Sequence, residues 1–192
     1  MMRALRYRGS KWRAMALLVV GQRTAAARVF RTMMVEFPAD PYALASLAHM
    51  QAQDGDRRSA MESLEQLVGL DPGEGRHWFN LGFVLEELGE YERALEALRR
   101  ATQLRPELDR AWYGLGLVLI RLQRLDEAVA ALKQNTRLQP MSPYGWYQLA
   151  RVHIDRQEPD EAVKIIRHLK GFEPKVAAQL ERETGLVTAP VL

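Results

Sequence analysis

The chain of 192 residues contains no cysteine. Disulfide bridges, thiolate metal ligands and a cysteine nucleophile are therefore excluded. A protein without disulfides fits a reducing compartment, and we expect a cytoplasmic location. The four histidines do not lie at metal-ligand spacing, so we interpret them as surface or groove side chains. They are His49, His77, His153 and His168.

The chain also lacks the usual sequence marks of catalysis. It has no glycine-rich loop of the phosphate-binding kind. Adjacent carboxylates, such as Glu86–Glu87 and Asp126–Glu127, are typical of solvated helix faces rather than of acid–base pairs. We therefore predict that the protein is not an enzyme and that it uses no metal and no cofactor.

No hydrophobic run approaches the ~20 residues that a membrane-spanning helix requires. An apolar run at residues 14–21 follows five basic residues, as the hydrophobic part of a signal peptide does. The run is short for that role, and the polar residues Gln22 and Arg23 follow it at once. We interpret it as part of the folded chain rather than as a cleaved signal.

The positive charge is concentrated at the N-terminal end. The whole chain has a formal net charge of +3, but residues 1–40 hold eight Lys or Arg against two acids, so the rest totals −3. This distribution argues against a nucleic-acid-binding surface along the whole chain. Binding of single strands by the basic end, with aromatic side chains stacking on bases, stays open as a weaker alternative.

The sequence does contain a regular repeat. Residues 78–106 begin Trp-Phe-Asn-Leu-Gly-Phe-Val-Leu and end Leu-Arg-Pro, and the same frame recurs every 34 residues without an insertion. A closing proline recurs as Pro38, Pro72, Pro106, Pro140 and Pro174. A small residue recurs as Ala26, Ala60, Ala94, Ala128 and Ala162. Recurrence of both positions at one fixed spacing indicates tandem structural repeats.

The order of these residues resembles the tetratricopeptide (TPR) signature, with Leu85 at its Tyr position and Leu98 at its Phe position. The resemblance implies an all-α, right-handed α-solenoid of about five helix hairpins, which acts as a scaffold for binding other proteins. Residues 176–183 have one apolar helical face, which predicts a C-terminal capping helix.

The repeat frame divides the chain into an array and two flanking segments. Residues 1–6 are an N-terminal extension, and residues 7–176 form the array. Residues 177–192 form the capping helix and a flexible tail. The five repeats are residues 7–40, 41–74, 75–108, 109–142 and 143–176.

Positions 4, 7, 8 and 11 of each repeat fall on one stripe of a helix and predict its packed face. In the third repeat they are Trp78, Leu81, Gly82 and Leu85. We expect position 8 to be small because the second helix of the hairpin crosses there, at Ala94 in the third repeat. We also expect Trp78 and its equivalents to occupy buried pockets between successive hairpins.

A second face of each first helix, about a third of a turn away, carries aromatic side chains mixed with arginine. The resemblance implies that this face lines a concave groove. Aromatic and arginine side chains are typical of binding hot spots, which predicts a groove for an extended or helical peptide segment of a partner protein. Its arginines are predicted to bind carboxylates. The predicted groove residues are Tyr42, His49, Arg76, Phe79, Phe83, Arg110, Tyr113, Leu117, Tyr144, Tyr147 and Arg151.

The first repeat keeps the signature least well, and its first helix is apolar on every side. A terminal repeat normally presents a polar outer face, so we expect something to cover it, with Met15, Leu18 and Val19 as a second interface. Residues 1–6 folding back, a partner protein, a second copy of the chain and a membrane surface all remain open. Docking of the uncharged tail, residues 186–192, in its own or a neighbour's groove is a further alternative.

Overall fold

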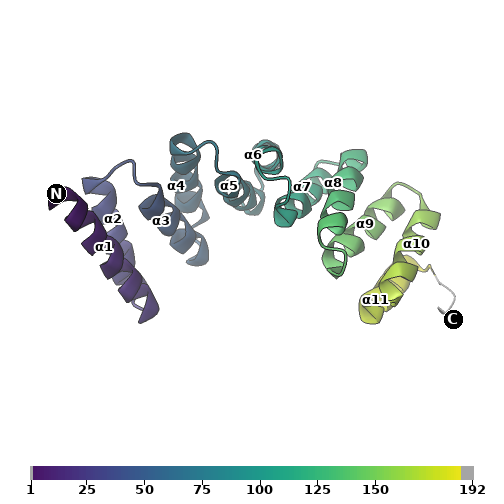
Figure 1. Ribbon diagram of the computed structural model, residues 1–192. Coiled ribbons are helices and arrows are strands. Elements are labelled where there is room, and N and C mark those ends of the chain that lie inside the picture. Colours follow the sequence, from purple (N-terminus) through teal and green to yellow (C-terminus); the bar gives the residue numbers. More distant parts are fainter. Residues whose placement is uncertain (1, 187–192) are drawn as a thin grey trace. The chain divides into compact units, whose positions relative to one another are not determined.

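The computed structural model describes residues 2–186, which contain helices and no strands. The helices follow one another as antiparallel hairpins with a final single helix (Figure 1). The prediction of an all-α solenoid of about five hairpins with a terminal helix is confirmed. The helices are α1 (Met2–Val19), α2 (Arg23–Glu36), α3 (Pro41–Gln53), α4 (Arg57–Leu70), α5 (Gly75–Glu87), α6 (Tyr91–Leu104), α7 (Asp109–Arg121), α8 (Leu125–Leu138), α9 (Pro143–Asp155), α10 (Pro159–Lys170) and α11 (Pro174–Thr184).

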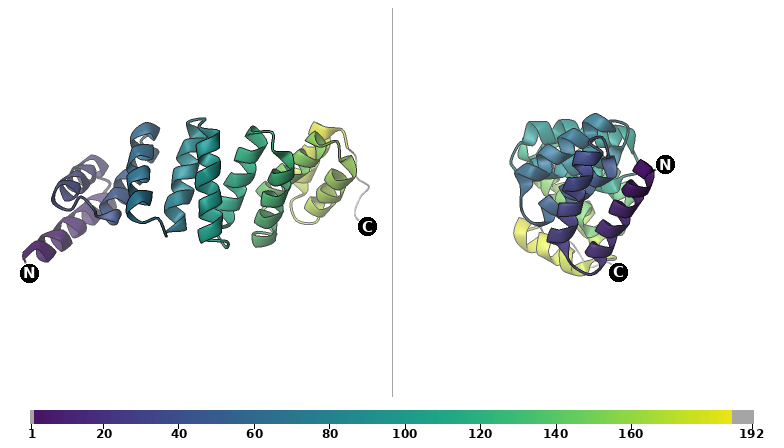
Figure 2. Two further views of the ribbon diagram at one scale, coloured as in Figure 1. Left: turned by 90° about the horizontal axis from the view of Figure 1, so that it is seen from above. Right: turned by 90° about the vertical axis from the view of Figure 1, so that its left-hand side faces the viewer.

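The chain forms two compact units, an N-terminal unit of residues 1–90 and a C-terminal unit of residues 91–192. Within each unit every helix packs against the next one in the chain. In the N-terminal unit, α1 and α2 lie side by side in both views of Figure 2. In the C-terminal unit, α11 also contacts α9, so the last helix packs against both helices of the preceding hairpin. No helix among residues 2–186 is long and apolar enough to cross a membrane.

Each hairpin turns at the fifteenth position of its repeat, where the backbone adopts a left-handed conformation. The residues are Gly21, Gly55, Gly89, Gln123 and Gln157, with φ values of 76°, 82°, 78°, 59° and 61°. Glycine adopts this conformation without steric cost, whereas a residue with a Cβ does not. The turn therefore belongs to the frame of the repeat and is kept even where glutamine replaces glycine.

The tryptophan and the proline of the signature meet in space. The Nε1 atoms of Trp78, Trp112 and Trp146 donate hydrogen bonds of 2.8–2.9 Å to the carbonyl oxygens of Pro72, Pro106 and Pro140, respectively. These tryptophans are only half-buried. The prediction that they occupy buried pockets therefore overestimated their burial. The indole N–H requires a partner, and the loop carbonyl that supplies it lies at the edge of the core.

The small residue at position 8 makes room for the second helix of its hairpin. At Gly116 of α7, an added Cβ would lie 2.7 Å from both Cγ and Cδ2 of Leu132 on α8. The close approach is thus made by Leu132, four residues beyond the alanine that the sequence suggested. Leu132 is completely buried, as are the equivalents Phe30 and Ile166 of other repeats. Large side chains of second helices therefore fill the space that position 8 leaves open.

The first hairpin is held differently from the others. Helix α1 begins at Met2, so residues 2–6 continue the helix and do not fold back over it. Three side chains spaced by four residues fix it to the end of the first repeat and the start of the second. Arg3 donates to the carbonyl oxygen of Glu36, Tyr7 Oη donates to Asp40 Oδ1, and Lys11 Nζ lies 3.8 Å from the ring centroid of Tyr42. Burial, assisted by the charge of Asp40, raises the pKa of the Tyr7 phenol.

Helix α11 closes the C-terminal unit. Ala177 and Leu180 are its buried side chains, and Gly185, at φ 71°, ends it. The predicted tail beyond Leu186 lies outside the described residues.

Candidate functional site

None of the side chains predicted to line a groove is buried. They stand at positions 2, 5 and 9 of the first helices α3, α5, α7 and α9. His49, Arg76, Phe83, Arg110, Tyr144 and Arg151 are exposed. Tyr42, Phe79, Tyr113, Leu117 and Tyr147 are half-buried. All eleven side chains can therefore be reached by a partner, except where another side chain of the protein already contacts them.

In the C-terminal unit, three of the predicted residues meet at a pocket of about 480 Å³. Tyr113 from α7 and Tyr144 and Tyr147 from α9 are among its lining residues. The pocket is completed by Pro143, Gln148, Glu173, Val176 and Gln179. Its lining combines aromatic rings with hydroxyl and amide groups, and Glu173 supplies its charged side chain. We call these eight residues the tyrosine pocket.

The repeat frame explains how the tyrosines come together. Tyr113 and Tyr147 occupy the same position in successive repeats, so stacking of α7 and α9 brings them to corresponding places. Tyr144 lies three residues before Tyr147 and shares its helical face. Gly145, between them, is buried, and a Cβ there would clash with Asn135 on α8. The close packing of α8 at Gly145 fixes the face of α9 that carries Tyr144 and Tyr147.

A polar network joins α11 to α9 beside the tyrosine pocket. Tyr147 Oη donates a 2.6 Å hydrogen bond to Glu183 Oε2, and Gln179 Nε2 donates a 2.8 Å bond to Glu183 Oε1. The bond from Tyr147, with that from Gln179, lowers the pKa of the Glu183 carboxyl. Arg151 donates to Tyr147 Oη and lies 3.9 Å from Glu183 Oε2, and these contacts raise the pKa of Arg151. Arg151, predicted to bind a carboxylate of a partner, is therefore already paired with one of this chain.

In the N-terminal unit, the predicted residues do different things. Tyr42 belongs to the core of the first hairpin, because its ring packs on Phe30 at 6.0 Å between centroids and lies beneath Lys11. His49 and Phe83 are exposed. The accessible predicted surface here is thus carried by α3 and α5, away from the packed start of α3.

The residues predicted for a second interface lie on α1. Met15, Leu18 and Val19 are all exposed, although Leu18 is close to half-buried. They are joined by other exposed apolar side chains that the prediction did not single out, Leu5 and Trp12 among them.

Three of the four histidines contact other side chains of the fold. His153, expected at the surface, is buried, with its Nδ1 atom 2.7 Å from Glu158 Oε2. His168 packs between the rings of Trp146 and Phe172. His77 lies near Asp71. Among residues 2–186, no group of three or more His, Asp or Glu side chains is placed to hold a metal ion.

Sequence reasoning did not find the part of the pocket that α11 contributes. Glu173 and Val176 lie at the end of the fifth repeat, where no groove residue was predicted, and Gln179 lies beyond it, in the segment predicted only to cap the array. Helix α11 begins at Pro174, three residues ahead of the 34-residue frame. The available signal was the polar side of this helix, since Gln179 and Glu183 are four residues apart on one face.

Comparison with known proteins agrees with this architecture. A family model described as tetratricopeptide repeat matches residues 46–109, 84–143 and 113–172, which together span well over half of the chain. No curated protein matched the chain in sequence.

Solved structures share the fold. A crystal structure of MamA is similar at a TM-score of 0.82 and 22% identity, over 96% of this chain and 98% of that one. YrrB, described as a TPR protein with an unusual peptide-binding site, has a TM-score of 0.79 and 19% identity, over 88% of both chains. TTC0263, a TPR protein of Thermus thermophilus, has a TM-score of 0.63 and 25% identity, over 94% of this chain and all of that one.

The repeat frame, the helix hairpins and the family match lead to one assignment. Proteins with this fold are protein–protein interaction scaffolds, generally without enzymatic activity. The chain belongs to the tetratricopeptide repeat family.

Proposed function

We propose that the chain is an adaptor that binds a peptide segment of a partner protein, with the tyrosine pocket as its main anchor site. The observation that carries the proposal is the meeting of Tyr113, Tyr144 and Tyr147 around one cavity of about 480 Å³. A helix face that only meets water has no need of three tyrosines. An assembly-factor or chaperone-like role is compatible with such a site.

The chemistry of the pocket favours a large side chain flanked by peptide backbone. Tyrosine rings offer apolar contact area at low cost in conformational entropy. The amides of Gln148 and Gln179 can donate to and accept from a peptide backbone. Because Glu173 is the charged group in the lining, the pocket suits an apolar, aromatic or cationic side chain rather than a carboxylate. Pairing of Arg151 with Glu183 points the same way.

Two further observations support the proposal. The fold neighbour YrrB carries a peptide-binding site, so this architecture can hold a peptide. Phe83 and His49 offer a second accessible surface, in the N-terminal unit. Affinities for such a groove are expected in the micromolar range, about −8 kcal/mol.

The test starts from a displayed library of random peptides selected on the full chain. Affinities of the selected peptides are then measured by fluorescence anisotropy for the wild type and for Tyr144→Ala. Tyr144 is 70% exposed, so its removal should leave the fold intact. If Tyr144 is a binding hot spot, the variant should bind about tenfold or more weakly. Met141→Ala is the matched control, because Met141 is 68% exposed, lies just before α9 and does not line the pocket.

Equal affinity of the wild type and Tyr144→Ala would contradict the assignment to the tyrosine pocket. If Phe83→Ala weakened binding and Tyr144→Ala did not, the peptide site would be assigned to the N-terminal unit. Binding of labelled single-stranded nucleic acid that falls steeply with salt would instead favour the nucleic-acid alternative.

A further inference from the structure

Helix α1 carries an apolar strip on the face turned away from α2 and α3. Leu5, Trp12 and Val19 are seven residues apart and are 60%, 72% and 85% exposed. Two turns of a helix nearly contain seven residues, so the three side chains lie in one line. The opposite face is the one that Tyr7, Ala14 and Leu17 pack into the core of the first hairpin. We call Leu5, Trp12 and Val19 the apolar strip.

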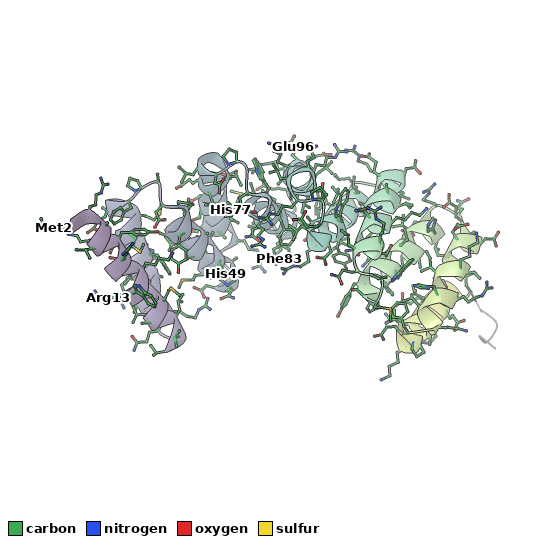
Figure 3. All side chains as sticks on the ribbon, in the orientation of Figure 1. Met2, Arg13, His49, His77, Phe83 and Glu96 are labelled. Atoms are coloured by element: carbon green, nitrogen blue, oxygen red, sulfur yellow. The ribbon has the colours of Figure 1, made fainter. Side chains whose placement is uncertain are left out.

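The strip is flanked by cations. Helix α1 contains five basic residues and no acid. Arg3 and Lys11 are turned inward, against Phe37 and Tyr42. At ~100° per residue, Arg8 stands beside the strip on one side and Arg13 about a quarter turn away on the other. Both are exposed, and Figure 3 shows Arg13 at the outer edge of the N-terminal unit.

A second cationic feature, a cavity, shares Arg13 with the flank of the strip. A cavity of about 370 Å³ runs between α1 and α2 and is lined by Arg13, Leu17, Gln22, Ala25, Arg28, Val29 and Thr32. It holds two guanidinium groups and no acid. Guanidinium groups bind phosphate oxygens in bidentate geometry. Arg13 belongs to both features, so the cavity continues the cationic flank of the strip.

Three occupants could cover such a face, and charge separates them. In a contact between two copies of α1, each copy would bring five cations and no acid, and these like charges would repel each other. An acidic protein surface would be complementary to the cations, but it would not require a long, narrow apolar strip. An anionic membrane surface is complementary to both features, because its headgroups attract the cations and its acyl chains accept the apolar strip. Tryptophan is enriched at membrane–water interfaces, and flanking arginines can reach back to the headgroups.

We propose that α1 lies on the surface of an anionic phospholipid bilayer. The apolar strip enters the boundary between headgroups and acyl chains, and Arg8, Arg13 and Arg28 bind lipid phosphates. The helix lies in the plane of the interface rather than crossing it, in keeping with the absence of a spanning helix among residues 2–186. Attachment by α1 is independent of the tyrosine pocket, which lies in the other unit.

The test is flotation of the full chain with vesicles of phosphatidylcholine, with or without phosphatidylglycerol, at low and high salt. We expect the chain to float with phosphatidylglycerol vesicles at low salt and not with phosphatidylcholine alone. The triple variant Arg8→Gln, Arg13→Gln, Arg28→Gln should bind on the order of a hundred-fold more weakly, because each arginine near an anionic surface contributes about fivefold. The control Arg137→Gln, Lys175→Gln, Arg182→Gln removes the same charge from exposed sites of the C-terminal unit and should still float.

The apolar contribution is tested separately with Trp12→Ser, which should reduce flotation while Met141→Ser does not. Circular dichroism shows whether each variant keeps its helices. Failure of the wild type to float with phosphatidylglycerol vesicles would overturn the proposal. Equal losses in the two triple variants would overturn it as well, because net charge alone would then explain binding. A lipid-free dimer in light scattering that Trp12→Glu converts to a monomer would show that a second copy covers the strip.

Discussion

The hairpins α1–α2 and α7–α8 occupy the same place in the 34-residue frame, yet their first helices are held in different ways. In α7 the indole of Trp112 reaches back to the carbonyl oxygen of Pro106. In α1 the equivalent position is Ser10, and the only tryptophan, Trp12, is 72% exposed. Arg3, Tyr7 and Lys11 do the anchoring instead.

This difference shows that the frame of the repeat and its signature are separable. The hairpin α1–α2 keeps the left-handed turn at Gly21 and the buried Ala26 and Phe30. Its first helix lacks the signature tryptophan and is held instead by Arg3, Tyr7 and Lys11, which are spaced by four residues. Because the anchors occupy one face only, the opposite face is free to carry the apolar strip.

The largest expected contrast is between the two tryptophans. Trp112→Ala removes a half-buried ring and leaves the carbonyl of Pro106 without its indole donor, so we expect unfolding free energy to fall by about 3 kcal/mol. Trp12→Ala should change it by less than about 0.5 kcal/mol, since that ring is exposed. Urea unfolding of both variants measures the difference. Similar losses would mean that Trp12 anchors α1 after all.

The second contrast uses glycines within the same two helices. Gly116→Ala places a Cβ against the buried Leu132 and should destabilise the protein by about 1–3 kcal/mol. Gly9→Ala, in α1, meets nothing within 4 Å. It should stabilise the protein by up to about 1 kcal/mol, because alanine favours helix over glycine. The opposite signs are read from urea midpoints. A loss at Gly9 would show that α1 is packed on its outer face.

The third contrast concerns the turns. Gly21→Gln puts a side chain at φ 76° and should cost about 1 kcal/mol. Gln123→Gly relieves the same strain at φ 59°. Its gain should be smaller, a few tenths of a kcal/mol, because glycine also gains freedom in the unfolded chain. Thermal unfolding compares the two. If Gln123→Gly destabilised the protein, its side-chain bond to the carbonyl of Ile120 would outweigh the backbone strain.

The periodic part of the fold could be predicted because it repeats in the sequence. Helix number, the turn at Gly55 and the small residue at Gly116 all follow from position within 34 residues. The bonds from Trp78, Trp112 and Trp146 to loop carbonyls could not, because the partner is backbone and leaves no trace in side-chain type. For the same reason their burial was overestimated.

The tyrosine pocket was predictable only in part. Tyr113, Tyr144 and Tyr147 stand at repeat positions that identify an accessible face. Gln179 lies on α11 beyond the last full repeat, and Glu173 directly precedes that helix, so the positions predicted to line the groove did not include them. Pairing of Arg151 with Glu183 depends on the same helix. Position within a repeat thus predicts which side chains are accessible, while the non-repeating helix decides which are already engaged.

The smallest expected effect concerns two tyrosine–carboxylate bonds, one at each end of the chain. Tyr7 donates to the buried Asp40, whereas Tyr147 donates to Glu183, which is exposed. Tyr147→Phe should raise the pKa of Glu183 toward its usual value, because the bond from Tyr147 is the main cause of its lowering. Carbon-13 titration of the glutamate carboxyls by NMR measures the shift.

The sign of the accompanying stability effect follows from linkage. Since the pKa of Glu183 is lower in the folded chain, its bond to Tyr147 contributes stability above the unfolded pKa of about 4.3, and this contribution is lost as pH falls through the folded pKa. The difference in stability between the wild type and Tyr147→Phe should therefore shrink on acidification. Glu127, whose pKa is lowered mainly by its bond with Arg124 on the preceding turn, is the internal control and should titrate identically in both proteins. A Glu183 titration unchanged by Tyr147→Phe would mean that Gln179 and Arg151 hold the carboxylate without the phenol, and that α11 is fixed to α9 by its buried Ala177 and Leu180 rather than by this bond.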